Sequence, residues 1–153
     1  VKNPAKRQAG QLMDRWVVVL GAGMLAPVAR RWKGQISEVA KAWGQFEALP
    51  EADHNSLAGI DAPADMLQNT VVLFLRSASD HPRNRLRSEL TQKTFMVAGL
   101  GTDFYLAQGE TRLAQLWTAI HYGDYTAYYL AMSYGVDPTP IPAISSLKNA
   151  MQA

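Results

Sequence analysis

Two side chains of the kinds that transfer protons lie in one segment of the chain, GQISEVAKAWGQFEALPEADHN, which spans residues 34–55. They are Glu38 and His54. A carboxylate can remove and return a proton, and an imidazole exchanges protons near neutral pH. Glu38 lies between Ile36 and Val39, and a carboxylate that is partly removed from water becomes a better base. The pattern by itself favours a solvated helix glutamate, so both interpretations of Glu38 stay open at this point.

The composition is that of one domain with a sizeable core. The chain has 153 residues, of which 48% are hydrophobic and 18% are charged, and this length is cramped for two domains. Its formal net charge is +2 and its isoelectric point is near 9.0, an excess too small to predict a nucleic-acid surface. An anionic small molecule remains a suitable ligand. Because cysteine is absent, disulfides, thiolate metal ligands and a cysteine nucleophile are excluded.

Membrane attachment is not indicated by the apolar segments. The longest apolar run begins at Trp16, is interrupted by glycines and by Pro27, and stops at Arg30, well short of the roughly 20 residues of a membrane span. The first twelve residues are polar and basic, without the apolar stretch of a signal peptide. We therefore expect a cytoplasmic protein with neither a membrane nor a nucleic acid as partner.

Apolar runs separated by helical patterns organise the chain. The expected strands are residues 16–20, 46–49, 69–75 and 104–107. The expected helices are residues 4–13, 24–43, 82–99, 110–133 and 143–151, with a helical turn at 51–60 and an extended segment at 137–142. Continuous apolar strands that alternate with helices predict a mainly parallel sheet covered on both faces. The predicted fold class is therefore α/β, a three-layer α/β/α sandwich.

Two of these helices carry more specific expectations. In the helix at 82–99, we expect Leu86, Leu90 and Phe95 to face the core. In the next helix, Gly123 suggests a bend. A group of arginines is expected on a solvated helix face, because residues two apart on a helix do not converge on a phosphate: Arg83, Arg85 and Arg87.

The loops that follow the strands are the expected position of a ligand. In parallel sheets, ligands bind at the carboxyl ends of the strands, where residues 21–23, 76–80 and 108–110 would gather. Residues 21–26, GAGMLA, also match the G-x-G-x-x-A form of a dinucleotide fingerprint. A glycine turn at a strand-to-helix junction explains the same residues and is the favoured interpretation, with NAD(H) binding as the weaker alternative. No pair of histidines has metal-ligand spacing, so we predict no metal site.

The order of several motifs resembles that of one enzyme family. The motifs are E-x-A-K at 38–41, E-x-L-P-x-x-x-H-N at 47–55, and Val-Asp-Pro-Thr-Pro at 136–140, which leads to Lys148. They resemble the C-terminal half of the bifunctional phosphoglucose/phosphomannose isomerases, which are built from two sugar-isomerase (SIS) domains. The resemblance covers nearly the whole chain. It implies that residues 1–153 form a single SIS domain with a flavodoxin-like fold.

The resemblance also implies roles for three residues. Glu38 would be the base that moves a proton between C1 and C2 of the sugar through a cis-enediol. His54 would assist ring opening and reach the active site of the neighbouring subunit, and Lys148 would contact the sugar oxygens. These residue types suit proton transfer and oxyanion stabilisation. The implied reaction is aldose–ketose isomerisation of glucose 6-phosphate and fructose 6-phosphate, with mannose 6-phosphate as a second substrate.

Further parts of the implied enzyme lie outside this chain. The family's phosphate-binding serine and threonine loop, and an arginine near the enediolate, belong to the N-terminal SIS domain, which has no counterpart here. We expect the chain to form a homodimer and to show little or no activity without an N-terminal SIS domain. We expect it to need no cofactor, neither a metal nor a nucleotide.

The chain departs from the family pattern at three positions. Ser37 and Val39 flank Glu38 where family members usually have asparagine, and Asp53 precedes His54 where asparagine is common. A second function therefore stays open, that of a non-catalytic, phosphosugar-binding regulatory SIS domain like those found beside DNA-binding domains. Such a domain needs no base at position 38, so Glu38→Gln would leave its ligand response intact.

Overall fold

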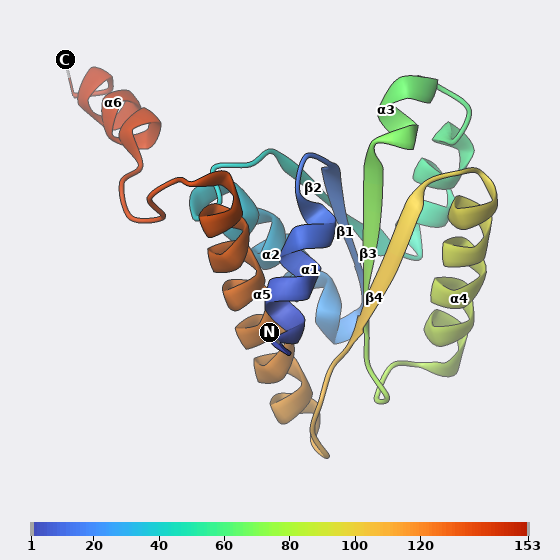
Figure 1. The fold of residues 1–153 in the computed structure, drawn as a ribbon. Coiled ribbons are helices and arrows are strands. Elements are labelled where there is room, and N and C mark those ends of the chain that lie inside the picture. Colours follow the sequence, from blue (N-terminus) through green and yellow to red (C-terminus); the bar gives the residue numbers. More distant parts are fainter. Residues whose placement is uncertain (1, 153) are drawn as a thin grey trace.

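Four strands, six α-helices and three short 3₁₀ turns make up residues 2–152, the part of the chain that the computed structural model describes (Figure 1). The strands are β1 (Trp16–Ala22), β2 (Gly44–Leu49), β3 (Thr70–Arg76) and β4 (Gly101–Leu106). The α-helices are α1 (Pro4–Leu12), α2 (Ala26–Glu38), α3 (Ala64–Gln68), α4 (Pro82–Val97), α5 (Arg112–Tyr134) and α6 (Pro142–Ala150). The 3₁₀ turns are η1 (Gly23–Leu25), η2 (Glu51–Asp53) and η3 (Ser56–Gly59). Each strand and helix predicted from the sequence overlaps an observed element, and α3 is a further helix that the sequence analysis did not predict.

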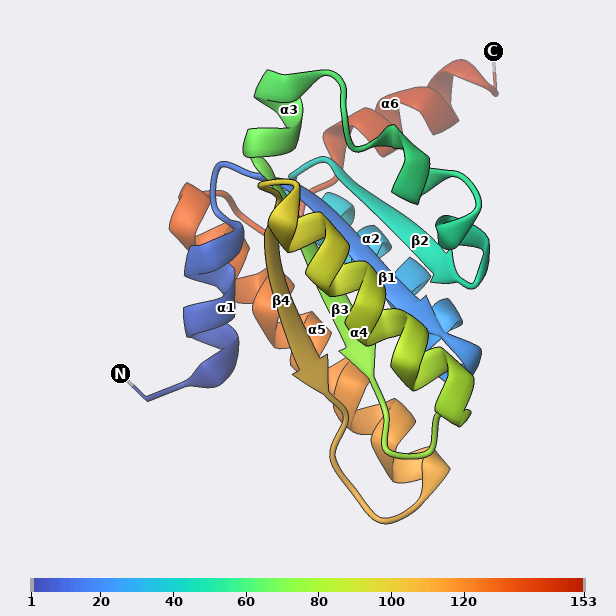
Figure 2. The ribbon, with the colours of Figure 1, turned by 90° about the vertical axis from the view of Figure 1, so that its right-hand side faces the viewer.

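The four strands form one parallel sheet in the order β2-β1-β3-β4. Backbone pairing places Val17 of the central strand β1 opposite Gly44 on one side and Val71 on the other. Figures 1 and 2 show α1, α2 and α5 on one face of the sheet and α4 on the other. The predicted three-layer α/β/α sandwich with a parallel sheet is therefore confirmed.

On the face covered by α1, α2 and α5, alternate strand residues build the core. Val19 of β1 and Leu73 of β3 are fully buried there together with Trp32 of α2. The indole Nε1 of Trp32 donates a hydrogen bond to the Ala119 carbonyl of α5 (2.9 Å). Because a buried indole N–H needs such a partner, this bond fixes how α2 and α5 pack.

The long helix α5 is uninterrupted from Arg112 to Tyr134, and Gly123, where the sequence suggested a bend, lies within it. Gly123 serves a close contact instead, because a Cβ at this position would overlap the ring of Trp32. The helix ends at Gly135, which adopts the left-handed conformation (φ 65°). Glycine is therefore required inside this helix for packing and at its end for conformation.

On the opposite face, α4 and the turns after β2 cover the sheet. Leu20 of β1 and Phe74 of β3 are buried against Phe95 of α4 and Ala52 of η2. The rings of Phe74 and Phe95 lie 6.3 Å apart in a tilted arrangement. Fully burying a side chain of this size contributes about 1.5–3 kcal/mol, so these contacts hold α4 and η2 to the sheet.

The inward face of α4 differs from the prediction. Phe95 is buried as expected, but Leu86 and Leu90 are exposed, at 47% and 56%. The helix instead turns Ser88 and Thr91 toward the sheet, where both are buried. Their hydroxyl groups are hydrogen-bonded to side chains of β3 and η2. Polar partners therefore set the orientation of this helix.

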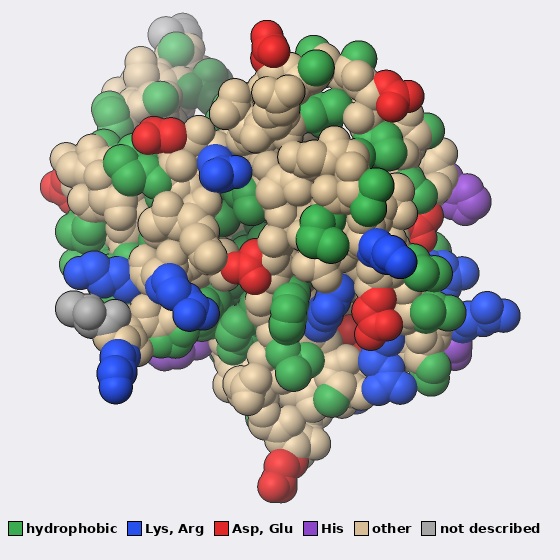
Figure 3. Space-filling view, turned by 45° about the vertical axis from the view of Figure 1, so that its right-hand side comes forward, with side chains coloured by type: hydrophobic (Ala, Val, Ile, Leu, Met, Phe, Trp, Pro, Cys, Tyr) green, Lys and Arg blue, Asp and Glu red, His purple; other side chains and the backbone are tan. Residues whose placement is uncertain are grey.

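The outer surface of α4 agrees better with the sequence. The three arginines expected on a solvated helix face are all exposed: Arg83, Arg85 and Arg87. Figure 3 shows basic, acidic and hydrophobic side chains interspersed over the side of the molecule that α4 helps to form. This mixture is in keeping with the small net charge of the chain.

The helix predicted for residues 24–43 is shorter than expected, because α2 ends at Glu38. Pro27 lies in its first turn, where the missing N–H is tolerated. Beyond the helix, Lys41 adopts a left-handed conformation (φ 57°), and the chain enters β2 at Gly44. Glu38 is thus the last residue of its helix rather than a residue in its middle.

Two kinds of feature are absent from residues 2–152. No helix there is both long and apolar enough to cross a membrane. Within the same residues, no group of three or more histidine, aspartate and glutamate side chains is arranged to hold a metal ion.

Candidate functional site

Glu38 borders an open cavity at the end of α2. The cavity has a volume of about 540 Å³, and Ser37 and Lys41 line it together with Glu38. Its other wall is formed by residues between 136 and 144, in the segment that connects α5 with α6 and in the first turn of α6. The E-x-A-K motif and the Val-Asp-Pro-Thr-Pro motif are therefore neighbours in space, although most of the chain separates them in sequence.

The environment of Glu38 agrees with the interpretation that the sequence pattern by itself favoured, that of a solvated helix glutamate. Its side chain is exposed, so Ile36 and Val39 do not remove it partly from water as the alternative interpretation required. Ile36 is buried in the core on another side of the helix, and Val39 packs at the edge of that core. In this chain alone, the cavity leaves the Glu38 carboxylate accessible to solvent.

Lys41 links the two walls of the cavity. Its ammonium group donates hydrogen bonds to the carbonyl oxygens of Glu38 (2.5 Å) and Pro138 (3.2 Å). A lysine at the carboxyl end of a helix is also favoured by the helix dipole. The sequence motif includes Lys41, but no local signal indicates its role, because Pro138 lies 97 positions away along the chain.

Lys148 lies on α6, a helix without any buried residue. Figure 1 shows this helix standing away from the rest of the molecule. Ile144 in its first turn lines the Glu38 cavity, and Lys148 follows four residues later on the same side of the helix. The structure therefore puts Lys148 beyond the cavity that contains Glu38, on a helix that is not packed against the body of the domain.

His54 lies on the opposite face of the sheet from Glu38. It is exposed and follows η2, whose residue Ala52 is buried on the α4 side. In Figure 2 the segment that carries His54 is on the α4 side, while α2 lies behind the sheet. The structure thus brings Glu38 close to the segment that leads to Lys148, but it does not bring His54 of the same chain to this cavity.

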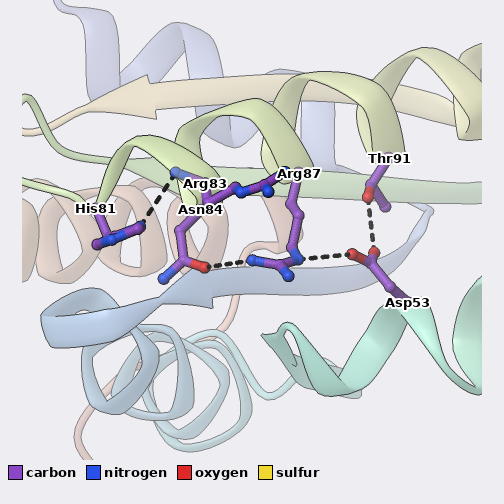
Figure 4. Close-up of polar contacts among 6 residues, drawn as sticks. All are labelled: Asp53, His81, Arg83, Asn84, Arg87 and Thr91. Carbon is purple, nitrogen blue, oxygen red and sulfur yellow. Dashed lines mark hydrogen bonds and ion pairs between the residues drawn. The ribbon is translucent and has the colours of Figure 1, made fainter.

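Asp53, which precedes His54, is bound to α4 (Figure 4). Its Oδ1 atom accepts a hydrogen bond from Thr91 Oγ1 (2.7 Å), and its Oδ2 atom lies 4.0 Å from Arg87 Nε. Arg87 also donates a hydrogen bond to Asn84 Oδ1 (3.3 Å). The aspartate at this position therefore fixes the turn that carries His54. No local pattern indicates this contact, because Asp53 and Thr91 are 38 positions apart.

The loops at the carboxyl ends of β1, β3 and β4 meet as predicted. Ser77, after β3, donates a short hydrogen bond through Oγ to Gln115 Oε1, and Gln115 Nε2 donates to the Gly109 carbonyl (2.9 Å). Asp80 of the same loop approaches the loop after β1, because a Cβ at Gly23 would lie 3.7 Å from its Oδ1 atom. This edge is distinct from the cavity at Glu38, since α2 runs away from it.

The glycines of the G-x-G-x-x-A pattern have structural reasons. A Cβ at Gly21 would collide with the carbonyl group of Leu25, and Gly23 has a left-handed φ of 50°. Both are therefore required for the tight passage from β1 into η1 and α2. Near the end of β2, Glu47 accepts a hydrogen bond from Gln45 (2.6 Å). The glycine-turn interpretation thus accounts for this motif without a nucleotide.

Known proteins match nearly the whole chain. The family model of the bacterial phospho-glucose isomerase C-terminal SIS domain matches residues 1–151. The bifunctional phosphoglucose/phosphomannose isomerase of Caldicellulosiruptor bescii is 34% identical over 151 residues, covering 98% of this chain and 44% of that protein. The protein of the same name from Aquifex aeolicus is 31% identical over 152 residues, covering 99% of this chain and 47% of that protein. The chain thus spans slightly less than half of these relatives.

Solved structures share the fold. A glucose-6-phosphate isomerase like protein from Thermus thermophilus superimposes with a TM-score of 0.75 at 26% identity, covering 90% of this chain and 45% of that chain. The C-terminal domain of glucosamine-fructose-6-phosphate aminotransferase from Francisella tularensis gives a TM-score of 0.63 at 13% identity, covering 88% and 40%, and supports the fold alone. The expected resemblance is confirmed by the match over residues 1–151, and this chain belongs to the bacterial phospho-glucose isomerase C-terminal SIS domain family.

Proposed function

We propose that this chain is the C-terminal SIS domain of an aldose–ketose isomerase that interconverts glucose 6-phosphate and fructose 6-phosphate and also accepts mannose 6-phosphate. The observation that carries the proposal is the position of Glu38, which shares a cavity with the segment leading to Lys148 in a chain of this family. The names of the relatives, bifunctional phosphoglucose/phosphomannose isomerases, supply the substrate class.

In the proposed reaction, Glu38 moves one proton. Its carboxylate removes the proton from C2 of the aldose while the C1 carbonyl oxygen gains a proton, which gives a cis-enediol. The same carboxyl group then returns its proton to C1 while the C2 hydroxyl group loses its own, which gives the ketose. One base is sufficient because both carbon atoms of a cis-enediol present the same face to it. The ammonium group of Lys148 stabilises the negative charge that develops on the sugar oxygen.

His54 acts, in this proposal, beside Glu38 of a second subunit, where its imidazole assists ring opening. The sheet lies between Glu38 and His54 of one chain, which supports assigning them to different subunits. A homodimer with two equivalent, shared sites follows from such an exchange.

An N-terminal SIS domain holds the phosphate group of the substrate in this proposal. This chain covers 44% and 47% of the two relatives, so each of them has length for such a domain. The exposure of Glu38 and the lack of any buried residue in α6 support a site that is completed by further protein. Packing of that protein would remove Glu38 from water and strengthen it as a base.

The test is a chimera in which the N-terminal half of the Caldicellulosiruptor bescii relative is fused to this chain. The chimera should isomerise glucose 6-phosphate, and Glu38→Gln should lower its kcat by about 10²–10⁴-fold, the usual contribution of a general base. Asp61→Asn makes the matched change from carboxylate to amide at an exposed position in the loop before α3 and should leave kcat unaltered. The complete relative serves as the positive control for the assay.

The same experiment separates the enzyme from the regulatory domain. A folded chimera that is inactive, yet gains thermal stability with fructose 6-phosphate whether or not residue 38 is changed, would contradict the enzymatic proposal. That outcome would favour the phosphosugar-binding regulatory domain, which requires no base at position 38.

A further inference from the structure

The outer side of α5 carries a row of exposed side chains, most of them large and apolar. They recur every three or four positions, the spacing that places residues in one row along a helix. The members of this row, which we call the α5 stripe, are Leu113, Trp117, His121, Tyr125, Tyr128 and Met132. The stripe extends over about 28 Å of the helix axis.

The opposite side of α5 belongs to the core. Ala119 and Leu130 are fully buried there in the same cluster as Trp32 of α2. Residues 112–134 contain two charged side chains, Arg112 at the start of the helix and Asp124, which is paired with Arg31 (2.9 Å). A helix that is apolar on opposite sides is typical of one that is covered on both. The α5 stripe thus has the composition of a surface that packs against further protein.

The amino-terminal end of the described chain lies along one edge of the stripe. Asn3 and Pro4 line an open groove of about 750 Å³ together with Trp117 and Tyr125. The Asn3 Nδ2 atom donates a hydrogen bond to the Tyr129 hydroxyl (3.2 Å), and Figure 1 shows α1 beside α5. A domain that is joined ahead of Asn3 therefore enters the structure at the edge of the α5 stripe.

The far end of the stripe leads to the Glu38 cavity. Met132 is in the last turn of α5, which ends at Gly135, and residues 136–144 then form one wall of that cavity. A domain that packs along the whole stripe is therefore brought next to the exposed Glu38. This position suits protein that completes the proposed site.

A second copy of this chain does not suit the stripe. His54 and the α5 stripe lie on opposite sides of the sheet (Figure 2). A copy that packs through its own stripe holds its His54 behind its own sheet, away from Glu38. The second subunit in the proposed function, which brings His54 to Glu38, must therefore bind elsewhere.

We propose that the α5 stripe is the surface on which an N-terminal SIS domain joined to this chain packs, through an uncharged, apolar face of its own. The inference rests on the proposed function, which supplies the domain, and goes beyond it by assigning the surface that holds the domain. Because the domain is joined close to the stripe, its local concentration there is high, and strong affinity between separate proteins is not required.

The test compares the isolated chain with the chimera that carries the N-terminal half of the Caldicellulosiruptor bescii relative. Hydroxyl radicals oxidise exposed side chains, and mass spectrometry measures the rate at each residue. The chain offers matched pairs of one residue type: Trp117 and Met132 lie in the stripe, whereas Trp43 and Met96 are exposed elsewhere. Since oxidation follows exposure, the pairs separate coverage of the stripe from a general change in reactivity.

We expect Trp117 and Met132 to be oxidised about fivefold more slowly, or slower still, in the chimera than in the isolated chain, because the centre of an interface excludes water. Trp43 and Met96 should keep similar rates in both proteins. The protection should persist when the chimera is diluted until it is monomeric by analytical ultracentrifugation, because a contact within one polypeptide does not depend on concentration.

A charged stripe should lose its partner. Tyr125→Lys combined with Tyr128→Lys puts two unpaired charges into the interface, so Trp117 and Met132 of this chimera should return to within about twofold of their rates in the isolated chain. The matched control is Leu86→Lys combined with Leu90→Lys, two exposed positions of α4, which should leave the protection intact. Circular dichroism verifies that both double variants are folded.

Two results would overturn the inference. Equal oxidation of Trp117 and Met132 in the folded chimera and in the isolated chain shows that the N-terminal domain does not cover the stripe. Protection that is already present in the isolated chain, and that disappears when the chain is diluted to monomers, shows that a second copy covers it. If the chimera does not fold, the corresponding chimera with the N-terminal half of the Aquifex aeolicus relative decides in the same way.

Activity is a separate readout in the same chimera. A chimera with an unprotected stripe that still isomerises glucose 6-phosphate contradicts this inference and leaves the proposed function standing. A chimera with a protected stripe that is inactive supports the docking surface and counts against the proposed function.

Discussion

The indole ring of Trp32 lies against the backbone of Gly123, so closely that a Cβ at position 123 would overlap the ring atoms Nε1, Cε2 and Cδ1. Trp32 is fully buried, and its N–H is bonded to the Ala119 carbonyl. This contact packs α2, which ends at Glu38, against the long helix α5. The relative position of the two cavity walls therefore depends on a residue without a side chain.

Replacing Gly123 by alanine should destabilise the fold. Because the new methyl group would overpack the Trp32 ring, we expect Gly123→Ala to lower the free energy of unfolding by about 1–3 kcal/mol. Gly34→Ala is the matched control, since a Cβ there meets no atom within 4 Å and alanine favours the helix by about 0.5–1 kcal/mol. Urea unfolding followed by circular dichroism measures both. Equal stabilities of the two variants would contradict the close contact.

Replacing Lys41 by glycine should alter the cavity with little change in stability. The variant loses two hydrogen bonds worth about 0.5–1.5 kcal/mol each, while glycine relieves a left-handed conformation that costs about 1–2 kcal/mol. We expect the kcat of the chimera to fall, because the segment after Val136 loses its link to Glu38.

The control for this change is Asp14→Gly. Asp14 has a similar left-handed φ of 59°, and its backbone N–H, which bonds to the Tyr134 hydroxyl, is retained in glycine. This variant should become more stable without a change in kcat. If Lys41→Gly, like Asp14→Gly, becomes more stable without a change in kcat, the link between the cavity walls has no role in activity.

Mixing two inactive variants should restore activity if each site is shared between subunits. In a dimer of one Glu38→Gln chain and one His54→Ala chain, one of the two sites retains both natural residues. Random association of equal amounts of the two chimeras should therefore give about a quarter of the wild-type kcat. Each variant alone remains the baseline. Co-purification on two different tags verifies that mixed dimers have formed. If the activity of these dimers stays at the baseline, Glu38 and His54 do not meet across subunits.

Asp80 should make stability depend on pH in a defined direction. Burial raises the pKa of Asp80 above its ordinary value of 3.8, and the Ser77 N–H only partly offsets this. The folded chain therefore binds the proton more tightly than the unfolded chain. Relative to Asp80→Asn, the wild type should gain stability as the pH falls through the raised pKa, with the gain complete below 3.8. The test measures the denaturation midpoints of both proteins between about pH 3 and pH 7. If the stability of the wild type relative to Asp80→Asn increases as the pH rises, the prediction is wrong.

The four strands and five of the six α-helices could be predicted from the sequence because they depend on local patterns, whereas the short helix α3 was not predicted. The run from Trp16 to Leu20 is continuously apolar, as in strands that are buried on both faces, and it forms most of β1. Pro27 is compatible only with a first helical turn, and Gly135 favours a helix end, and both positions agree with the structure. The family was likewise recognisable from motifs, because residue types and their spacing are visible in the sequence.

The orientation of α4 could not be predicted in this way. Leu86 and Leu90 suggested an apolar inward face, yet the helix turns Ser88 and Thr91 to the sheet. These hydroxyl groups are bound by side chains from β3 and η2, which lie elsewhere in the sequence. Hydrophobic periodicity cannot anticipate a face that is selected by polar partners.

The sequence by itself determined the kinds of element, the family and the identity of the residues suited to chemistry, because these follow from local periodicity and residue type. Only the tertiary structure decided that Glu38 shares a cavity with the segment leading to Lys148, while His54 lies across the sheet. The physical reason is that the direction of α2 and the order of the parallel strands set these distances. The helix direction and the strand order both arise from long-range packing, such as the contact of Trp32 with Gly123. Such contacts cannot be inferred from the number of residues between Glu38 and His54.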